Sequence, residues 1–316
     1  MTTTEDLKSA DLNELVRSDH PMRRVSDHLP PFSVVVPCFN EVECIRSTVE
    51  ALAEVTVASG AELIVVEDGS TDGSRLLLEE IERSGEFVSL RVVRHASNFG
   101  YGAAVKTGVR RARAELIVII DADGTYPCGR IPDLVTTAAE ADMVVGARIE
   151  GNAGQQLLRR FAKNILRAHC SWLVGERIPD MNSGLRVFRK SVAERFFKIL
   201  PDGFSLTTTL TVAMMRNRYT VVFEPIAYAV RIGRSKIRPL RDTLGFIQLI
   251  VRTGMYFAPL RVLLPLVAVL SAAFAVSLGY DIVVLKNLTD KTIILLLFAM
   301  NTALFALLAD MIDKRS

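Results

Sequence analysis

Two aspartates stand where an uninterrupted apolar run ends. Asp121 and Asp123 follow the segment Leu116-Ile117-Val118-Ile119-Ile120 directly. Such a run indicates a parallel strand covered on both faces, and open α/β sheets bind ligands just beyond the carboxyl ends of their strands. Paired carboxylates there suit Mg²⁺ or Mn²⁺, which prefer oxygen ligands. Taken alone, the tripeptide fits an acidic turn equally well.

Acidic residues also follow two earlier apolar runs. The first run leads into Pro37, Phe39 and Glu41, and the second ends in Glu67-Asp68. An aromatic ring and an acid above the first strand would suit a nucleoside base and its ribose. The structural alternatives are that Pro37 ends the strand, that Glu41 complements a helix dipole and that the second acidic loop is an ordinary turn.

Basic residues gather in the second half of the chain at three places. Arg148 follows an apolar run, Arg160 lies in a helical pattern, and residues 231–236 form the compact loop Arg-Ile-Gly-Arg-Ser-Lys. Arginine suits phosphate because its planar fork donates paired hydrogen bonds, and lysine acts as a point charge. The alternative for any single one of them is solvated surface.

Short β-branched runs alternate with helical patterns over the first half of the chain. The runs cover residues 33–36, 63–66, 88–93, 116–120 and 143–145, and helical patterns begin near Glu41, Asp72, Tyr101 and Ile131. Alternation of this kind predicts an α/β fold with a doubly wound, mostly parallel sheet and right-handed connections. The acidic strand ends should therefore share one edge. A long helix over about 154–174 and a mixed α/β stretch to about 230 complete the expected domain.

Composition points to a membrane segment. The 316 residues are 50% hydrophobic, with a mean hydropathy of +0.29 and a net charge of only +3, which gives no nucleic-acid signature. No charge occurs between Arg261 and Asp281 or between Lys291 and Asp310. The first segment would span roughly 28 Å as a helix, about one bilayer core. We expect a transmembrane hairpin; buried core helices are the alternative.

The segment before the hairpin is basic. Residues 231–261 hold seven basic residues and one acid, interleaved with apolar side chains. This pattern is typical of an amphipathic helix on an anionic leaflet, although a helix packed on the domain would read similarly. Basic flanks weakly place the domain in the cytosol. The expected organisation is a polar tail (1–31), a catalytic domain (32–238), a juxtamembrane helix (239–260) and a hairpin with a short cytosolic tail (261–316).

The four cysteines and four histidines form no recognisable chemical motif. No CxxC spacing occurs, which argues against a zinc site or a disulfide framework and favours a reducing compartment. The histidines are scattered, so surface or capping roles are favoured over a metal site or a catalytic triad.

The order of these motifs resembles a known enzyme family. VVVPCFNE, EDGSTDGS, NFGYGAAVKTG, DADGTYP, GARIEG, NSGLRVF and RIGRSK occur in the order and approximate spacing of family 2 glycosyltransferases with the GT-A fold. More narrowly, the chain resembles the dolichyl- or polyprenyl-phosphate sugar synthases that add a membrane hairpin. The likeness covers about residues 32–240 by motif and the hairpin by topology alone.

The resemblance implies roles for individual residues. Nucleotide contacts are implied for Pro37, Phe39, Glu41, Asp68 and Asp121. Binding of a divalent metal, Mg²⁺ or Mn²⁺, is implied for Asp121 and Asp123. Acceptor phosphate binding falls to Arg148, Arg160, Arg231, Ser235 and Lys236, and the catalytic set is Asp123, Arg148, Arg231 and Lys236. The chain departs from the family at Phe39, where Tyr is usual, at Glu67, where Asp is usual, at Thr125-Tyr126, where Gln and His are frequent, and at Asn164, where some relatives have Ser.

These roles describe an inverting, metal-dependent hexosyltransferase that moves a sugar from a nucleoside diphosphate sugar to a polyprenyl phosphate. A phosphate monoester has its second pKa at about 6, so the acceptor is already a nucleophile at neutral pH and needs no general base. Three alternatives stay open: a polysaccharide or protein acceptor, a nucleotidyltransferase, and a catalytically silent membrane-anchored binding or scaffold protein. A nucleotidyltransferase would need an early glycine- and basic-rich loop, which the sequence lacks. The sugar, base, lipid length and any homo-oligomeric state are not fixed by the sequence.

Overall fold

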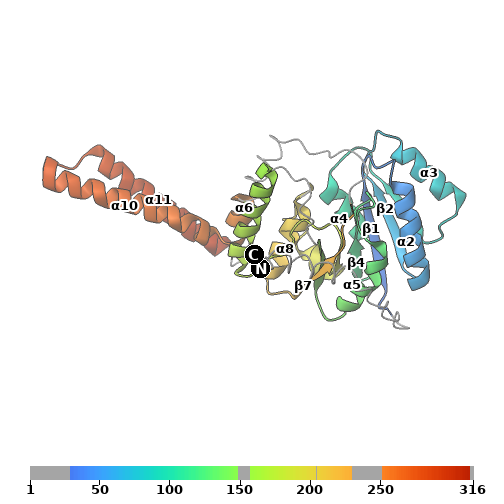
Figure 1. The fold of residues 1–316 in the computed structure, drawn as a ribbon. Helices are drawn as coiled ribbons and strands as arrows, with labels where there is room; N and C mark the ends of the chain where they lie inside the picture. Colours follow the sequence, from blue (N-terminus) through green and yellow to red (C-terminus); the bar gives the residue numbers. More distant parts are fainter. Residues whose placement is uncertain (1–28, 149–156, 204, 230–250, 314–316) are drawn as a thin grey trace, which may run out of the picture.

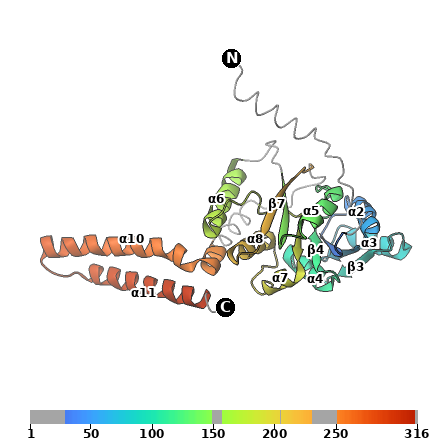
Figure 2. The same ribbon diagram turned by 90° about the horizontal axis from the view of Figure 1, so that it is seen from below.

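The computed structural model describes residues 29–148, 157–203, 205–229 and 251–313, and the side chains of 157–163 lie outside the described part. Figures 1 and 2 show an α/β body built on a central sheet, from which the long hairpin of α10 (Pro259–Tyr280) and α11 (Asp290–Asp313) projects. A short π-helical segment, η2 (Asp281–Leu285), leads into the hairpin turn.

Within the described part of the chain, seven strands form one sheet in the order β3-β2-β1-β4-β6-β5-β7. Their bounds are β1 (Phe32–Cys38), β2 (Glu62–Glu67), β3 (Leu90–Arg94), β4 (Leu116–Ile119), β5 (Met143–Arg148), β6 (Arg186–Arg189) and β7 (Val221–Ile226). All neighbouring pairs are parallel except the two that β6 makes, with β4 and with β5. The expected mostly parallel sheet is confirmed, and its one antiparallel member comes from the second half of the domain.

Helices cover both faces of the sheet. They are α2 (Ile45–Ser59), α3 (Ser74–Ser84), α4 (Tyr101–Arg111), η1 (Cys128–Arg130), α5 (Ile131–Thr137), α6 (Leu157–Val174), α7 (Lys190–Arg195) and α8 (Leu206–Arg216). Because side chains alternate along a strand, Val34 and Val36 pack with α2, α3 and α5, whereas Val35 packs with α4, α7 and α8. A third cluster joins α6 and α8 to Phe257.

The five strands that the sequence predicts are present, and α3, α4 and α5 begin close to the predicted starts, whereas β6 and β7 were expected only as part of a mixed α/β stretch. One helix start differs. A helix was expected near Glu41, but α2 begins at Ile45. The backbone carbonyl of Glu41 accepts hydrogen bonds from Cys44 at 3.1 Å and Ile45 at 2.9 Å, so residues 41–44 form a turn. The turn leaves Glu41 in the loop above β1 and removes it from the helix end.

The C-terminal hairpin stands apart from the core. Both helices are long and apolar enough to cross a membrane, and only 6% and 17% of their most apolar windows are buried. This low burial does not fit the alternative of core helices. At its base, Arg261 donates from Nη1 to the carbonyl of Trp172 at 3.3 Å, and Arg216 donates from Nη2 to the carbonyl of Phe257 at 2.9 Å. These bonds tie the hairpin to α6 and α8.

The domain boundaries stay predictions. Residues 251–257 are helical, consistent with a juxtamembrane helix, but residues 1–28 and 230–250 lie outside the described part. All four cysteines are free thiols.

Candidate active site

The acidic strand ends meet at one edge of the sheet. Strands β2, β1 and β4 are adjacent and parallel, so the residues after each of them emerge on the same side. Ile120 donates its N–H to the carbonyl of Val35 at 3.2 Å, and Asp68 donates to the carbonyl of Cys38 at 2.9 Å. The acid loops of β2 and β4 are therefore fixed against the end of β1, as the sequence predicts.

Pro37 lies inside β1 and does not end the strand. Pairing with β4 stops at Val35, opposite Ile119, while pairing with β2 continues to Cys38. The missing N–H of proline thus falls where no β4 residue remains to accept it, which makes proline acceptable in a central strand. The departure of β4 from β1 at this point opens the space above the sheet edge.

The turn after β1 is fixed by the loop after β2. Asn40 has a positive φ of 55°, and its N–H donates to Ser70 Oγ at 3.0 Å. The N–H of Glu41 donates to Ser74 Oγ at 2.9 Å. Phe39 and Glu41 are thereby held partly exposed above the sheet edge. These loop-to-loop bonds were not predicted, because they join residues thirty or more positions apart.

Asp68 is buried and its carboxylate organises the loop before α4. It accepts hydrogen bonds from the N–H groups of Phe99 at 3.0 Å and Gly100 at 2.8 Å, and Nδ1 of His95 lies 2.7 Å away. A Cβ on Gly69 would come within 2.5 Å of the backbone at Ser97, so the two loops touch. A direct nucleotide contact by Asp68 stays a prediction. In the structure the Asp68 carboxylate holds the loop before α4 through these hydrogen bonds.

His95 does not have the surface role that the sequence favours. Its second ring nitrogen, Nε2, lies 3.0 Å from Thr107 Oγ1, so the ring bridges Asp68 and α4. Phe99 packs edge-on against it with ring centroids 5.2 Å apart.

Asp121 and Asp123 emerge together after β4. Thr48 Oγ1 donates to the carbonyl of Ala122 at 3.1 Å, which fastens the tripeptide to α2. Asp123 is buried, and its Oδ1 accepts from Thr125 Oγ1 at 2.6 Å. Burial raises the pKa of the Tyr101 hydroxyl, and the negative charge of Asp121 raises it further.

The two carboxylates fit a divalent cation that is completed by a ligand. Among the described residues no group of three or more His, Cys, Asp or Glu could hold a metal ion. A Mg²⁺ or Mn²⁺ ion normally takes one or two carboxylates together with substrate phosphates and water. Asp121 and Asp123 supply that number of carboxylates, so the residues present suit a metal bound together with a diphosphate.

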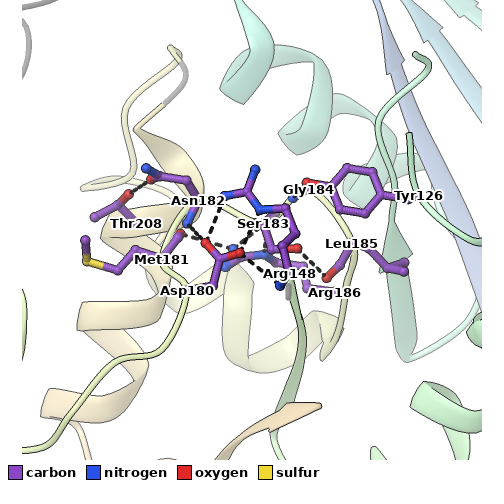
Figure 3. A network of polar contacts seen from close by, with 10 residues as sticks. All are labelled: Tyr126, Arg148, Asp180, Met181, Asn182, Ser183, Gly184, Leu185, Arg186 and Thr208. Atoms are coloured by element: carbon purple, nitrogen blue, oxygen red, sulfur yellow. Dashed lines mark hydrogen bonds and ion pairs between the residues drawn. The ribbon is translucent and has the colours of Figure 1, made fainter. Parts of the chain in front are cut away.

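Arg148 closes the far side of the site at the end of β5. It donates from Nε to Asp180 Oδ2 at 2.7 Å and from Nη2 to Oδ1 at 2.9 Å (Figure 3). Burial alone would lower the pKa of Arg148 and raise that of Asp180, but the ion pair outweighs burial and shifts each pKa the other way. Arg148 is thus held charged, with Asp180 as its present partner.

Arg186 holds the loop between α6 and β6 and is buried completely. Its guanidinium donates to the carbonyls of Ser183 at 2.7 Å, Met181 at 3.3 Å and Thr207 at 3.0 Å. It also donates to Thr211 Oγ1 at 3.0 Å. The loop that carries Asp180 is therefore fastened to α8 through one side chain.

The remaining acceptor-side predictions lie outside the described residues. These are the Arg160 side chain and the basic loop residues Arg231, Ser235 and Lys236. Their assignments stay predictions, as does the contact of Arg148 with an acceptor.

Sequence reasoning missed three residues of the site. Asp180 stands in a loop without a motif of its own, whereas Arg186 belongs to NSGLRVF, whose only signal was the motif itself. Tyr126 was noticed only as a departure from the family pattern. The structure places its hydroxyl 2.7 Å from the backbone nitrogen of Gly184.

Comparison with known proteins identifies the sequence pattern. Residues 33–197 match the family described as "Glycosyl transferase family 2". A similar protein is the undecaprenyl-phosphate 4-deoxy-4-formamido-L-arabinose transferase of Pseudomonas fluorescens, 29% identical over 73% of this chain and 66% of that protein. Its namesake from Pseudomonas aeruginosa is 32% identical over 56% of this chain and 55% of its own length. The chain thus spans less than two thirds of these curated relatives.

Solved structures share the fold. Glucosyl-3-phosphoglycerate synthase from Mycobacterium tuberculosis, in complex with Mn²⁺, UDP-glucose and phosphoglyceric acid, superimposes with a TM-score of 0.55 at 21% identity. The match covers 71% of this chain and 80% of that one. The same enzyme with Mn²⁺, UDP and glucosyl-3-phosphoglycerate gives a TM-score of 0.52 at 20% identity.

Proposed function

Because the chain belongs to glycosyl transferase family 2, we propose that it is a membrane-anchored, inverting hexosyltransferase. It transfers a sugar from a nucleoside diphosphate sugar to the phosphate of a polyprenyl lipid. The arrangement of Asp121 and Asp123 at the end of β4, beside the acid loop of β2, carries this proposal. The curated relatives are named for sugar transfer to undecaprenyl phosphate, which supports the choice of acceptor.

The donor side of the site is the edge formed by β2, β1 and β4. Asp121 and Asp123 would hold Mg²⁺ or Mn²⁺, which would neutralise charge on the leaving diphosphate. A fold shared with structures that contain Mn²⁺ and UDP-glucose is compatible with either metal. Phe39 and Glu41, held partly exposed above the edge, would contact the nucleoside together with Pro37 and Asp68.

The acceptor side lies beyond β5. Two anions must approach each other for transfer, so positive charge is needed around the acceptor phosphate. Arg148 is charged and stands at the end of β5, beside the site. Arg160, Arg231, Ser235 and Lys236 would complete the phosphate site, according to the family pattern.

Membrane anchoring places the acceptor within reach. The helices α10 and α11 would span the bilayer as a hairpin and return the C-terminus to the side of the catalytic domain. We place that domain on the cytosolic face, because Arg252, Arg261, Lys314 and Arg315 flank the hairpin on this side. Arg261 at the hairpin base also donates to the carbonyl of Trp172 on α6, which supports a catalytic domain held close to the membrane surface.

The test is a transfer assay with the purified full-length protein. Undecaprenyl phosphate is supplied with a panel of radiolabelled nucleotide sugars and Mn²⁺ or Mg²⁺, and labelled product is measured in the organic phase. One sugar of the panel should give a lipid-soluble product, and chelation with EDTA should abolish it. Asp123→Asn should reduce transfer at least about a hundredfold, the size of effect seen when an electrostatic catalytic group is lost. Asp133→Asn, at an exposed carboxylate on α5, is the matched control.

Different outcomes separate the competing functions. Label that moves only to a water-soluble glycan or protein would replace the lipid acceptor with the alternative acceptor class. Undiminished transfer by Asp123→Asn would remove the metal assignment. A protein that binds no nucleotide sugar in calorimetry with Mn²⁺ would support the binding or scaffold alternative.

A further inference from the structure

Tyr126 occupies a position where the two halves of the site meet. It follows the acidic tripeptide of β4 closely in sequence, yet its hydroxyl accepts a hydrogen bond from the N–H of Gly184 at 2.7 Å (Figure 3). Tyr126 as a whole is 5% exposed. A buried phenol thus joins the β4 loop to the loop before β6.

Gly184 also contacts Asp121, one of the two acids of the proposed metal site. A Cβ at position 184 would lie only 2.2 Å from Asp121 Oδ2 and 2.5 Å from Oδ1, so the glycine backbone forms a wall against the carboxylate. The hydrogen bond between the N–H of Gly184 and Tyr126 therefore also holds the backbone that lies against the Asp121 carboxylate. If the acceptor at Tyr126 is lost, a buried N–H loses its partner and the loop can move relative to Asp121.

The ring of Tyr126 is connected to Arg148 through Tyr228. Its ring packs edge-on against Tyr228, with centroids 5.1 Å apart. The guanidinium carbon of Arg148 lies 5.2 Å from the centroid of the Tyr228 ring. Ala229 donates its N–H to the carbonyl of Thr125 at 3.0 Å, which keeps the two aromatic residues in register.

The chain of contacts closes on itself. Arg148 pairs with Asp180, which also accepts from the N–H of Asn182 at 3.0 Å. Asn182 in turn accepts from Thr208 Oγ1 at 2.6 Å, and two residues further the loop reaches Gly184. The Asp121 carboxylate and the Arg148 guanidinium are thus linked by one connected series of contacts.

We propose that Tyr126 is a positioning residue that sets the relation between the metal-binding acids and Arg148. Its hydroxyl positions the Gly184 wall against Asp121, and its ring positions Arg148 through Tyr228. This inference rests on the proposed function, since it assigns the two sides to donor and acceptor. It predicts that the hydroxyl and the aromatic contact serve different sides and can be separated by substitution.

The hydroxyl is tested with Tyr126→Phe in the full-length protein. Uridine diphosphate and guanosine diphosphate are first compared with the wild-type protein, and the one that gives the tighter Mn²⁺ binding is used throughout. Mn²⁺ affinity is then measured by electron paramagnetic resonance in the presence of that nucleotide. We expect Mn²⁺ affinity and kcat each to fall about tenfold, as for one buried donor left without an acceptor. The KM for polyprenyl phosphate should stay within about twofold of the wild-type value. Tyr219→Phe, which removes the hydroxyl of a half-buried tyrosine that accepts an exposed hydrogen bond from Arg195, is the matched control.

The ring contact is tested with Tyr228→Leu against Tyr228→Phe. Tyr228→Leu removes the aromatic face under Arg148 and should raise the KM for polyprenyl phosphate about fivefold, the size of one cation–π contact. It should leave Mn²⁺ affinity unchanged, and Tyr228→Phe should behave as the wild type. The losses of kcat/KM in Tyr126→Phe and Tyr228→Leu should multiply in the double variant, because each substitution acts on a different side of the site.

Several results would overturn the inference. If Tyr126→Phe had the Mn²⁺ affinity and kcat of the wild type, the hydroxyl would have no positioning role and the residue would serve only core packing. The same conclusion follows if Tyr126→Phe lowers Mn²⁺ affinity and thermal stability and also raises the acceptor KM, since a general loosening would explain all three changes. Failure of the wild type itself to bind Mn²⁺ with a nucleoside diphosphate would instead refute the proposed function.

Discussion

Arg148 and Asp180 form a two-point ion pair, with Nε to Oδ2 at 2.7 Å and Nη2 to Oδ1 at 2.9 Å. The side chains are 21% and 12% exposed, so the pair is largely withdrawn from water. The guanidinium fork of Arg148 is thus matched in charge and geometry by a carboxylate. Asp180 keeps Arg148 oriented and charged, and under the proposed function an acceptor phosphate would have to share or replace this partner.

This pair predicts a specific acid sensitivity. Burial would raise the pKa of Asp180, but the Arg148 hydrogen bonds outweigh it and lower the pKa below the ordinary 3.8. A depressed carboxyl pKa contributes stability that is present above the unfolded-state pKa and is lost as the pH falls through the folded-state pKa. The contribution should begin to fade below about pH 5.

Asp180→Asn tests this sensitivity. At neutral pH it should lower the free energy of unfolding by about 1–3 kcal/mol, because Arg148 loses its counter-charge. Below about pH 5 the melting temperatures of variant and wild type should converge. Thermal melts of the detergent-solubilised protein across pH measure both effects, with Asp133→Asn as the exposed control. A constant difference between variant and wild type at all pH values would contradict the pairing.

Gly184 makes a second prediction, because it leaves no room for a side chain beside Asp121. Gly184→Ala would place a methyl group 2.2 Å from Oδ2, so the carboxylate or the loop must move. We expect transfer to fall at least about a hundredfold, as for a misplaced catalytic group. Gly203→Ala, where a Cβ would meet nothing within 4 Å, is the control. Equal activity of the two variants would show that the Asp121 position is not critical.

The sequence predicts well that the acidic strand ends share one edge of the sheet, because the determinants of this edge are local. Apolar runs specify β1, β2 and β4, and adjacency of parallel strands then brings Asp68 and Asp121 to one edge without any knowledge of side-chain contacts. Each step uses residues close together in the chain. The start of α2 was misplaced because Glu41 joins a turn whose bonds come from a distant loop.

The acceptor side could not be predicted in the same way. Arg148 was selected for its residue type, but its partner Asp180 lies 32 positions away in a loop without periodicity. Burial of Arg186 is equally invisible, because arginine is almost always a surface residue and its acceptors are backbone carbonyls. Such contacts depend on how the loop before β6 packs on α8, which only the folded chain determines.

Arg186 provides a third prediction, concerning stability. Its guanidinium satisfies three carbonyls and the Thr211 hydroxyl in a site with no exposure. Arg186→Lys keeps the charge but cannot reach all of these acceptors, because an ammonium lacks the planar fork. We expect a loss of about 2–4 kcal/mol in the free energy of unfolding. Thermal melts against Arg189→Lys, at a more exposed position on the same strand, measure it. Similar melting temperatures for both variants would contradict a structural role.

The turn of the membrane hairpin gives a fourth prediction. Asp281 is buried, and its Oδ2 accepts from the N–H of Thr289 at 2.8 Å, from Thr289 Oγ1 at 2.8 Å and from Thr292 Oγ1 at 2.7 Å. One carboxylate oxygen thereby satisfies the start of α11 and joins it to the end of α10. Asp281→Ala should lower stability by about 1–3 kcal/mol through these lost bonds. Thermal melts in detergent compare it with Asp290→Ala, whose side chain is exposed in the same turn. Because the turn between α10 and α11 lies at the end of the hairpin that points away from β1 and β4 in Figures 1 and 2, transfer at low temperature should be unchanged. Equal melting temperatures for the two variants would mean that the hairpin is held by its apolar contacts alone.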